Sequence, residues 1–367
     1  MPLRVRFYSF TVKPRYSLAI AGLSFVLATA VQAPARAQSA EPPPIATSPD
    51  PSADAPAAAP APAPEAPPPA EAPPPEPTSA EAPPAPPADK PKPPPYSLPF
   101  QLRPVAPGNV IRSDTSLGLY KNPTTGDSGN AVASLLLASY KVTDSFAPLV
   151  RVGIVHNSPP SGPSATNFLN PVLGGIYGFK LSPEWKLGLF LGVTVPIGSG
   201  GGNDAKPEKK AANAAGIPTR AAMDNAMFAV NDFTVFPGVD LAYVAHGFTA
   251  QVEATLLQLT RVKGDAPAVP DSSRTNFTAG LHVGYFLIPQ LSLGAELRHQ
   301  RWLSTPKAVE ANDSLRDTTT VAFGPRVHVK LSPTMWLRPG VSFGLPLDDP
   351  MKASKYKLLQ FDIPFIF

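Results

Sequence analysis

The chain has 367 residues, a formal net charge of +4 and no cysteine. The lack of cysteine excludes disulfides, thiolate metal sites, a cysteine nucleophile and a lipid-modified N-terminal cysteine. The positive balance comes from the first 37 residues. Without them, 26 basic residues face 27 acidic ones, so the charge gives no reason to expect a nucleic-acid partner.

Residues 1–37 have the pattern of a secretory signal peptide. Basic residues between Arg4 and Arg15 precede the uncharged run Ser17–Val31, and Ala35-Arg36-Ala37 offers the small residues of a cleavage site before Gln38. The alternative is an uncleaved anchor, but the run is short for a membrane-spanning helix, which needs about 20 residues.

Residues 38–95 form a segment of Pro, Ala, Glu and Ser without an aromatic residue. Such a composition cannot bury enough apolar surface to offset the entropy of ordering, so we expect a disordered linker. One interpretation is a semi-rigid periplasmic spacer that binds another envelope component. The alternative is a solvated tail without a specific partner.

Residues 96–367 make up the third predicted region, an all-β transmembrane barrel. The last strand, Tyr356–Phe367, alternates apolar residues on one face with mostly polar or small residues on the other. An exposed terminal strand of this kind would promote aggregation in a soluble protein, whereas a lipid-facing strand with both edges paired would not. The alternative is the edge of a soluble β-sandwich. Leu291–Leu303 alternates in the same way, with Glu296 and Arg298 on its polar face.

Short and long breaks alternate between the predicted strands, which predicts an up-and-down antiparallel barrel of about twelve strands. Short periplasmic turns and longer external loops are typical of outer-membrane barrels. The predicted short turns are 143–145, 182–184, 245–247, 288–290 and 332–334, and the predicted loops are 121–129, 157–166, 198–225, 261–273, 304–316 and 347–355. No membrane-spanning helix is expected in the mature chain.

Motifs of enzymes are scarce. The five histidines show no metal-ligand spacing, and there is no Gly-x-Ser-x-Gly elbow. His282 or His328 with a serine leaves a lipid hydrolase as an alternative, and Asp204 with Glu208 leaves a calcium site in a loop. We favour polar lumen residues for the first pair and a solvated charge cluster for the second, and we expect no cofactor.

The polar face of the predicted strands carries charged residues that would line the lumen. Charged walls select the solutes that enter a pore, but they can also pair with each other and close it. Both interpretations stay open. The candidate lumen residues are Arg151, Lys186, Asp240, Glu253, His282, Glu296, Arg298, Arg326, His328, Arg338 and Asp362.

Residues 187–201, LGLFLGVTVPIGSGG, resemble the strand and Pro-x-Gly loop start of outer-membrane barrels of the phenol-degradation meta-pathway type. Pro171-Val-Leu-Gly174 is similar to the Pro-x-Leu-Gly of a preceding strand in that family, and Phe367 looks like the C-terminal assembly signal of outer-membrane proteins. The resemblance implies a twelve-stranded barrel with a transport role and no particular substrate. The proline-rich linker departs from the usual form of the family.

These observations predict an outer-membrane channel or transporter for small solutes in a Gram-negative envelope, with the linker in the periplasm. The expected partners are outer-membrane lipid, the barrel-assembly machinery acting on the C-terminal strand, a small solute and a periplasmic partner of the linker. A structural barrel without transport is the main alternative.

Overall fold

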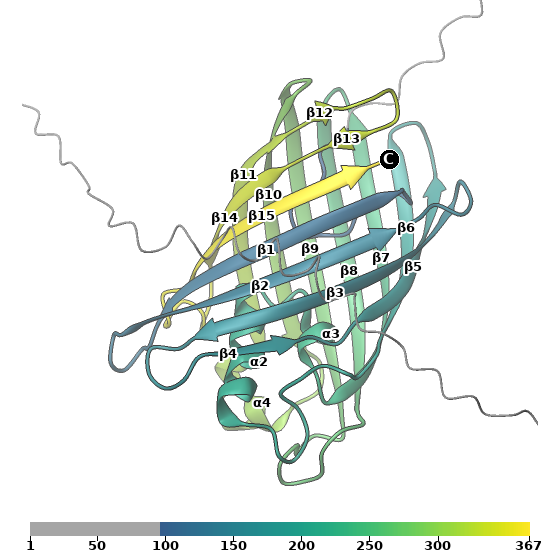
Figure 1. The fold of residues 1–367 in the computed structure, drawn as a ribbon. Coiled ribbons are helices and arrows are strands. Elements are labelled where there is room, and N and C mark those ends of the chain that lie inside the picture. Colours follow the sequence, from purple (N-terminus) through teal and green to yellow (C-terminus); the bar gives the residue numbers. More distant parts are fainter. Residues whose placement is uncertain (1–95) are drawn as a thin grey trace, which may run out of the picture. The chain divides into compact units, whose positions relative to one another are not determined.

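The computed structural model describes residues 96–367, which form a closed antiparallel barrel of twelve strands (Figure 1). The predicted signal peptide (1–37) and linker (38–95) lie outside the described residues, so their boundaries remain predictions.

The barrel strands follow one another around the wall in chain order. They are β1 (Val110–Lys121), β2 (Ser128–Ser139), β3 (Phe146–Ser158), β5 (Val172–Lys180), β6 (Trp185–Thr194), β7 (Asp232–Ala245), β8 (Phe248–Arg261), β9 (Ser273–Ile288), β10 (Leu291–Trp302), β11 (Asp317–Val327), β14 (Gly340–Pro346) and β15 (Lys357–Ile366). Three short strands extend this wall: β4 (Ala165–Phe168) pairs with β3, and β12 (Val329–Lys330) pairs with β13 (Trp336–Leu337).

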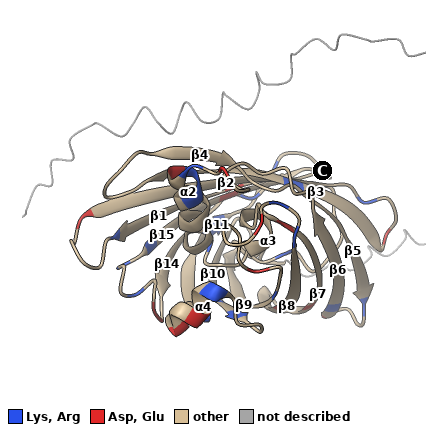
Figure 2. Cartoon of the chain, turned by 90° about the horizontal axis from the view of Figure 1, so that it is seen from below, with Lys and Arg blue, Asp and Glu red and all other residues tan. Residues whose placement is uncertain are grey.

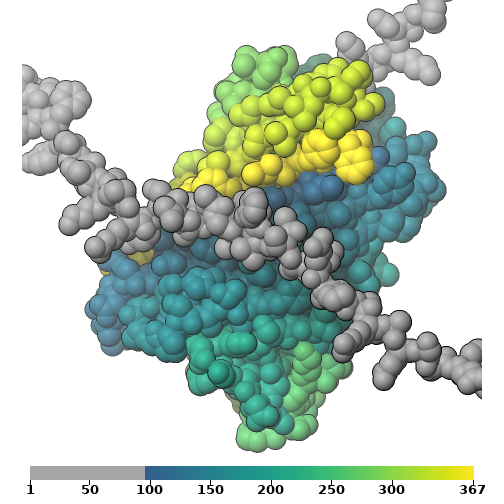
Figure 3. Space-filling model, in the orientation of Figure 1, coloured from purple at the N-terminus to yellow at the C-terminus, as the bar shows by residue number. Residues whose placement is uncertain are grey.

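The first and last strands close the barrel. β1 and β15 pair from Val110 opposite Ile366 to Leu119 opposite Lys357, and they lie side by side in Figure 3. The N–H of Phe367 adds a hydrogen bond of 3.2 Å to the carbonyl of Asn109. No edge of the wall is left unpaired along this seam, which removes the aggregation hazard of an open sheet.

The two faces of the wall differ as the alternation predicts. On β10, Leu293 is 47% exposed and points outward, whereas Glu296 is 1% exposed and lies inside. Phe361 and Ile363 of β15 are likewise exposed, while Gln360 and Asp362 are buried. An apolar outer surface around a polar interior is the arrangement of a membrane-spanning barrel. A soluble barrel would have its apolar face inside. The β-sandwich alternative is excluded because the twelve strands form one sheet that closes on itself.

Turns and loops also fall where the sequence places them. The five short turns and the C-terminus lie at one end of the barrel, and the helices lie at the other (Figure 1). The loops at that end carry α2 (Pro207–Thr219), α3 (Asn225–Phe228), α4 (Lys307–Ala311) and the 3₁₀ turn η1 (Asp313–Leu315). Figure 2 looks into this end and shows α3 within the opening of the barrel. Within residues 96–367, none of the helices is long and apolar enough to span a membrane.

We expect deletion of Phe367 to lower the yield of assembled barrel, because Phe367 completes the β1–β15 seam and stacks on Phe365 with ring centroids 5.8 Å apart. The yield is read from the fraction of protein with heat-modifiable migration. Phe323→Ala is the matched control, since it removes a lipid-facing phenylalanine that is 53% exposed and lies away from the seam. An unchanged yield after loss of Phe367 would contradict the prediction.

Candidate functional site

The segment that precedes β1 fills the lumen. Residues 96–107, here called the plug segment, begin at the short-turn end, where the Tyr96 hydroxyl donates to Gln251. The segment reaches into the barrel and returns to the same end, where Ser139 donates to the carbonyl of Gly108. Phe100 and Leu102 are each 1% exposed. The segment contains three prolines and bends at residues 100–102 and 105–106, and it has no helix or strand, so its backbone groups need partners elsewhere.

Basic side chains of the wall hold the carbonyl groups of the plug segment. Arg112 of β1 donates to the carbonyls of Pro99, Phe100 and Leu102, at 3.3 Å for Pro99 and for Leu102. Arg326 of β11 donates to those of Leu98 (3.2 Å) and Pro99 (3.0 Å). Both arginines also pair with Asp362 of β15, Arg112 at 2.6 Å. The two guanidinium groups share one carboxylate, and most of their other donors bind the plug segment, while Arg326 also donates to the carbonyl of Arg338 at 2.6 Å.

Acidic and amide side chains hold its N–H groups and further carbonyls. Glu296 accepts from the N–H groups of Phe100 and Gln101, and Glu253 accepts from that of Arg103 at 2.7 Å. Among the amides of the wall, Gln360 donates to the Phe100 carbonyl at 2.9 Å and Gln251 to the Arg103 carbonyl at 2.6 Å. The wall therefore recognises the main chain of the segment along most of its length.

Inward-facing glycines give this segment its space. A Cβ built on Gly284 would lie 2.2 Å from the Ser97 hydroxyl, one on Gly280 would lie 2.4 Å from Leu102, and one on Gly188 would lie 2.8 Å from the Val105 carbonyl. Gly178 and Gly238 are similarly close to Pro107 and Arg103. Glycine on the inner face thus leaves room for the plug segment, in addition to marking the polar side of each strand.

Phe100 and Arg103 anchor the plug segment through their side chains. The Phe100 ring lies between the guanidinium of Arg326, at 5.1 Å, and the ring of His282, at 6.5 Å. Arg103 pairs with Asp240 at 3.4 Å and Glu253 at 3.3 Å, and its guanidinium lies 4.4 Å from the Phe190 ring centroid. Each anchor combines a charge interaction with an aromatic face.

The eleven candidate lumen residues all lie on the inner side of the wall. Three of them, Arg151, Lys186 and Arg338, are half-buried. The other eight are buried: Asp240, Glu253, His282, Glu296, Arg298, Arg326, His328 and Asp362. Most contact the plug segment or one another. Arg298 pairs with Glu296 at 2.5 Å, His328 bonds Ser292 at 2.9 Å, and Arg338 donates to the Tyr96 carbonyl at 3.4 Å. Whether they contact a solute stays a proposal.

His282, the residue on which a hydrolase would depend, is fully buried beside Glu296, with 3.5 Å between the imidazole and the carboxylate. It lies inside the lumen, away from the lipid-facing surface that a lipid substrate would reach. In residues 96–367, the loop with Asp204 and Glu208 included, no group of three or more His, Cys, Asp or Glu side chains is placed to hold a metal ion.

The loop between β6 and β7, residues 195–231, forms a second barrier. This inward loop carries two helices. The first, α2, has Pro207 in its first turn and packs against β2, β3 and β4, and the second, α3, is buried. The sequence left open whether this loop enters the lumen, and the structure places it there. Its Met227 and Phe228 join the apolar cluster that includes Leu135, Phe190 and Leu257 of the wall.

Arg220 ties the inward loop to the wall. Its fully buried guanidinium donates to both carboxylate oxygens of Asp114 on β1, at 2.7 Å each, and to Asp224 at 2.7 Å. Asp224 also accepts from Arg151 on β3. Burial acts to raise the pKa of the Asp224 carboxyl, but the charges of Arg151 and Arg220 outweigh it and hold that pKa below its usual value. Burial acts to lower the pKa of Arg220, and the two carboxylates outweigh it in the same way and raise that pKa.

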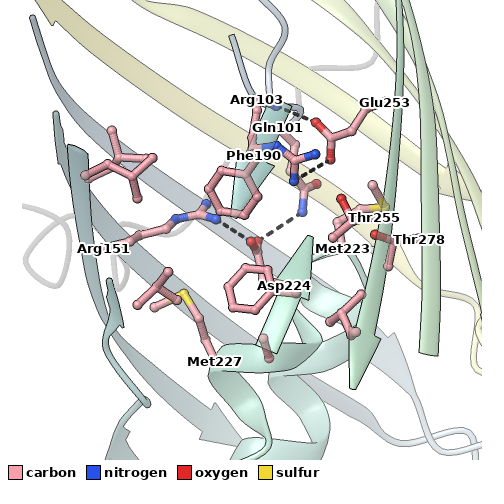
Figure 4. A pocket seen from close by; sticks show the side chains of 16 residues that line it. Gln101, Arg103, Arg151, Phe190, Met223, Asp224, Met227, Glu253, Thr255 and Thr278 are labelled. Atoms are coloured by element: carbon pink, nitrogen blue, oxygen red, sulfur yellow. Dashed lines mark hydrogen bonds and ion pairs between the residues drawn. The ribbon is translucent and has the colours of Figure 1, made fainter. Parts of the chain in front are cut away.

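A cavity of about 70 Å³ separates the two barriers (Figure 4). Gln101, Arg103, Arg151, Asp224 and Glu253 supply its polar lining, and apolar side chains such as Phe190 and Met227 supply the rest. The cavity is large enough to admit water. It lies inside the barrel, beside both the plug segment and the inward loop.

Several residues of this site were absent from the sequence prediction. Arg112 and Asp114 lie on the inner face of β1, whose alternating polar residues could have revealed them. Arg103, Arg220 and Asp224 lie outside the strands, where no periodic pattern exists to assign them a direction. The role of residues 96–107 was missed for the same reason.

No family model matches the chain, and no curated protein matches it. Solved structures with a similar fold include an outer membrane channel from Pseudomonas putida F1, at 15% identity and a TM-score of 0.46, covering 73% of this chain and 98% of that one. The NanC porin has 10% identity and a TM-score of 0.41, with 70% and 98% of the two chains covered. The KdgM porin, solved with disordered oligogalacturonate, has 10% identity and a TM-score of 0.40, with 70% and 99% covered. These similarities concern the fold alone, and the resemblance to the meta-pathway family remains a prediction.

Proposed function

We propose that the protein is an outer-membrane channel for small solutes whose path is closed, in this structure, by the plug segment and the inward loop. The observation that carries the proposal is the glycine-lined space around residues 96–107. A barrel that only provides structure can fill its lumen with side chains of its own wall. Here the wall leaves room, and a chain segment joined to it at Gly108 fills that room.

The contacts that hold the plug segment are of a kind that water can replace. They are chiefly hydrogen bonds from charged and amide side chains to the main chain, together with the two anchors Phe100 and Arg103. If the segment leaves, Arg112, Arg326, Glu296 and Asp362 become the charged lining of a hydrated path. Such a lining selects solutes by charge and size. The candidate lumen residues would then act in solute contact as well as in closure.

The same proposal implies an orientation of the barrel in the outer membrane. The short-turn end, from which Tyr96 enters, faces the periplasm, and the end with α2 and α4 faces outward. The predicted linker, which ends at residue 95 just before Tyr96, then lies on the periplasmic side, where a partner could bind it. Assembly through the C-terminal strand and lipid contact around the wall complete the expected set of partners.

A structural barrel without transport is the second candidate. The observation that favours it is the close pairing of the lumen charges, such as Arg298 with Glu296 and Arg112 with Asp362. This pairing would persist in a barrel that never opens. The two candidates differ in one respect, namely whether loosening the plug segment produces conductance.

Arg326→Ala tests this difference. The change removes the donors to the Leu98 and Pro99 carbonyls and one partner of Asp362, and hydrogen bonds to charged groups contribute about 1.5–3 kcal/mol each. We expect the open fraction of single channels in a planar bilayer to rise by at least about tenfold.

Arg301→Ala is the control for this variant, because the exposed Arg301 near the end of β10 pairs with Asp317 at the start of β11, and no hydrogen bond or ion pair joins it to the plug segment. Both variants should assemble into heat-modifiable barrels. If both give the same silent membrane as the unmodified protein, the structural candidate is preferred.

A further inference from the structure

The two barriers of the lumen meet at one side chain. The Gln101 amide donates to the carbonyl of Arg220 at 2.6 Å and to the carboxylate of Asp224 at 3.3 Å. Within residues 96–367, the hydrogen bonds between the plug segment and the inward loop all involve Gln101. Figure 4 shows the Gln101 amide directed at Asp224 across the cavity.

Both acceptors of Gln101 belong to the anchor of the inward loop. Arg220 and Asp224 are the residues that bind the loop to Asp114 on β1 and Arg151 on β3. When the plug segment leaves, the Arg220 carbonyl and the Asp224 carboxylate each lose one hydrogen bond. The carbonyl keeps the N–H of Met223 at 3.0 Å, and the carboxylate keeps Arg220 and Arg151. Each lost hydrogen bond removes a part of the stabilisation, so the anchored state of the loop becomes less stable.

A second set of hydrogen bonds connects the plug segment to the inward loop through the barrel wall. The Gln360 amide donates to the Phe100 carbonyl of the plug segment and to the Asp114 carboxylate, at 2.9 Å each. Asp114 in turn holds Arg220. Loss of the Phe100 carbonyl frees Gln360 to reorient, which alters the main wall contact of the inward loop. Phe100 and Gln101 are neighbours in the chain, so the two sets of hydrogen bonds respond to the same displacement.

The cavity beside this junction permits the two barriers to separate. Gln101 Oε1, Thr255 Oγ1 and Arg151 Nε line it and have no hydrogen-bond partner among the described residues. Gln101 and Thr255 are more than nine-tenths buried. A cavity with unsatisfied polar atoms admits water, and water can replace the contacts of Gln101 as it withdraws. The junction is therefore weaker than a close-packed apolar contact of the same extent.

We propose that Gln101 couples the plug segment to the inward loop, so that displacement of the plug segment at the periplasmic end releases the loop at the outer end. The two barriers then open together. This inference rests on the proposed gated channel. It adds that displacement of the plug segment on the periplasmic side comes first and release of the inward loop on the outer side follows. By the same coupling, removal of the loop from outside weakens the binding of the plug segment.

The chain contains no cysteine, so single introduced cysteines report on each barrier separately. Ser97→Cys, here called the plug probe, reports on the plug segment, and Ala212→Cys, the loop probe, reports on α2, since both positions are 1% exposed or less. Ser314→Cys, in an exposed turn, gives the intrinsic rate of the reagent. The measured quantity is the rate of modification by a small water-soluble thiol reagent in the assembled full-length protein.

Arg326→Ala displaces the plug segment without touching the inward loop. We expect it to raise the rates at the plug probe and the loop probe by about tenfold when Gln101 is present. With Gln101→Ala in addition, the rate at the plug probe should rise as before, while the rise at the loop probe caused by Arg326→Ala should shrink by several-fold. A chain that lacks residues 96–107 gives a second test, because its loop probe should react as fast as in the Arg326→Ala chain or faster.

The outcomes separate this inference from the proposed function. If the plug probe becomes reactive and the loop probe keeps its slow rate, or if the effect on the loop probe is the same with and without Gln101, the coupling is wrong and the gated channel stands. If neither probe responds to Arg326→Ala, and the loop probe stays slow in the chain lacking residues 96–107, both proposals fail.

Discussion

A chain that lacks residues 96–107 should form steadily open channels, with a conductance several-fold above any opening of the intact protein. The deletion removes the peptide that fills the lumen and, with Gln101, the hydrogen bonds to Arg220 and Asp224 that help to hold the inward loop, and it leaves the twelve strands and their pairing unchanged. It also exposes the donors of Arg112 and Arg326 that the plug carbonyls now occupy. Because these groups would line the open path, we further expect the current to depend on the charge of the permeating ion.

The matched control is a deletion of the same length within the predicted linker, residues 61–72, which leaves the plug segment in place. Single-channel recording of both proteins, refolded in the same detergent, distinguishes a specific role of residues 96–107 from a general effect of shortening the chain. If the two deletions give the same record, removal of the plug segment does not open the lumen and the prediction is wrong.

Arg220→Ala should release the inward loop. The change leaves the carboxylates of Asp114 and Asp224 buried without their main partner, and breaking a buried ion pair in this way costs about 3–5 kcal/mol. The expected result is loss of hydrogen-exchange protection in α2, with amide exchange faster by roughly a hundredfold or more. Mass spectrometry of the peptide covering residues 207–219 measures it.

Arg316→Ala serves as the control for this variant. Arg316 pairs with Asp313, which is highly exposed, so its removal should cost at most about 1 kcal/mol and leave α2 unaffected. Exchange in the strands should be the same in both variants, because neither change touches the barrel pairing. Full protection of α2 in the Arg220→Ala protein would show that apolar contacts such as that of Phe228 suffice to hold the loop.

The barrel was predictable because its strands carry a local signal. On β10 the alternation of Leu293 and Leu297 with Glu296 and Arg298 assigns each side chain to a face without reference to any other segment. The same holds for β15. Turns with proline and polar residues separate the strands, which gave the correct number. The short strands β4, β12 and β13 were not predicted separately, since they extend neighbouring strands across small irregularities.

The plug segment was not predictable in this way because its conformation depends on distant residues. Phe100 finds its partners in Glu296 and Gln360, which are about 200 and 260 positions away in the chain. An irregular segment rich in proline has no period that indicates a buried position. The position of Arg220 depends equally on Asp114, 106 residues earlier.

One part of the sequence pattern does point to the plug segment in retrospect. The predicted inner face carried more basic than acidic residues, and this left two interpretations, a selective pore and a closed lumen of paired charges. In the structure Arg112 and Arg326 share Asp362 and use most of their other donors on carbonyl groups of residues 98–102, while Arg326 also donates to the carbonyl of Arg338. The surplus of basic residues is matched by main-chain carbonyls, which a count of charged side chains does not include.

The most direct test of the account is a reversible lock on the plug segment. The hydroxyl oxygens of Ser97 and Ser292 lie 3.4 Å apart, so cysteines at both positions are close enough to form a disulfide. In the Arg326→Ala background, the oxidised Ser97→Cys, Ser292→Cys protein should be silent in a planar bilayer, and a reductant added to the same membrane should start steady openings. The Arg326→Ala protein without these cysteines should conduct throughout. Equal conductance of the oxidised and reduced forms would contradict the claim that residues 96–107 close this channel.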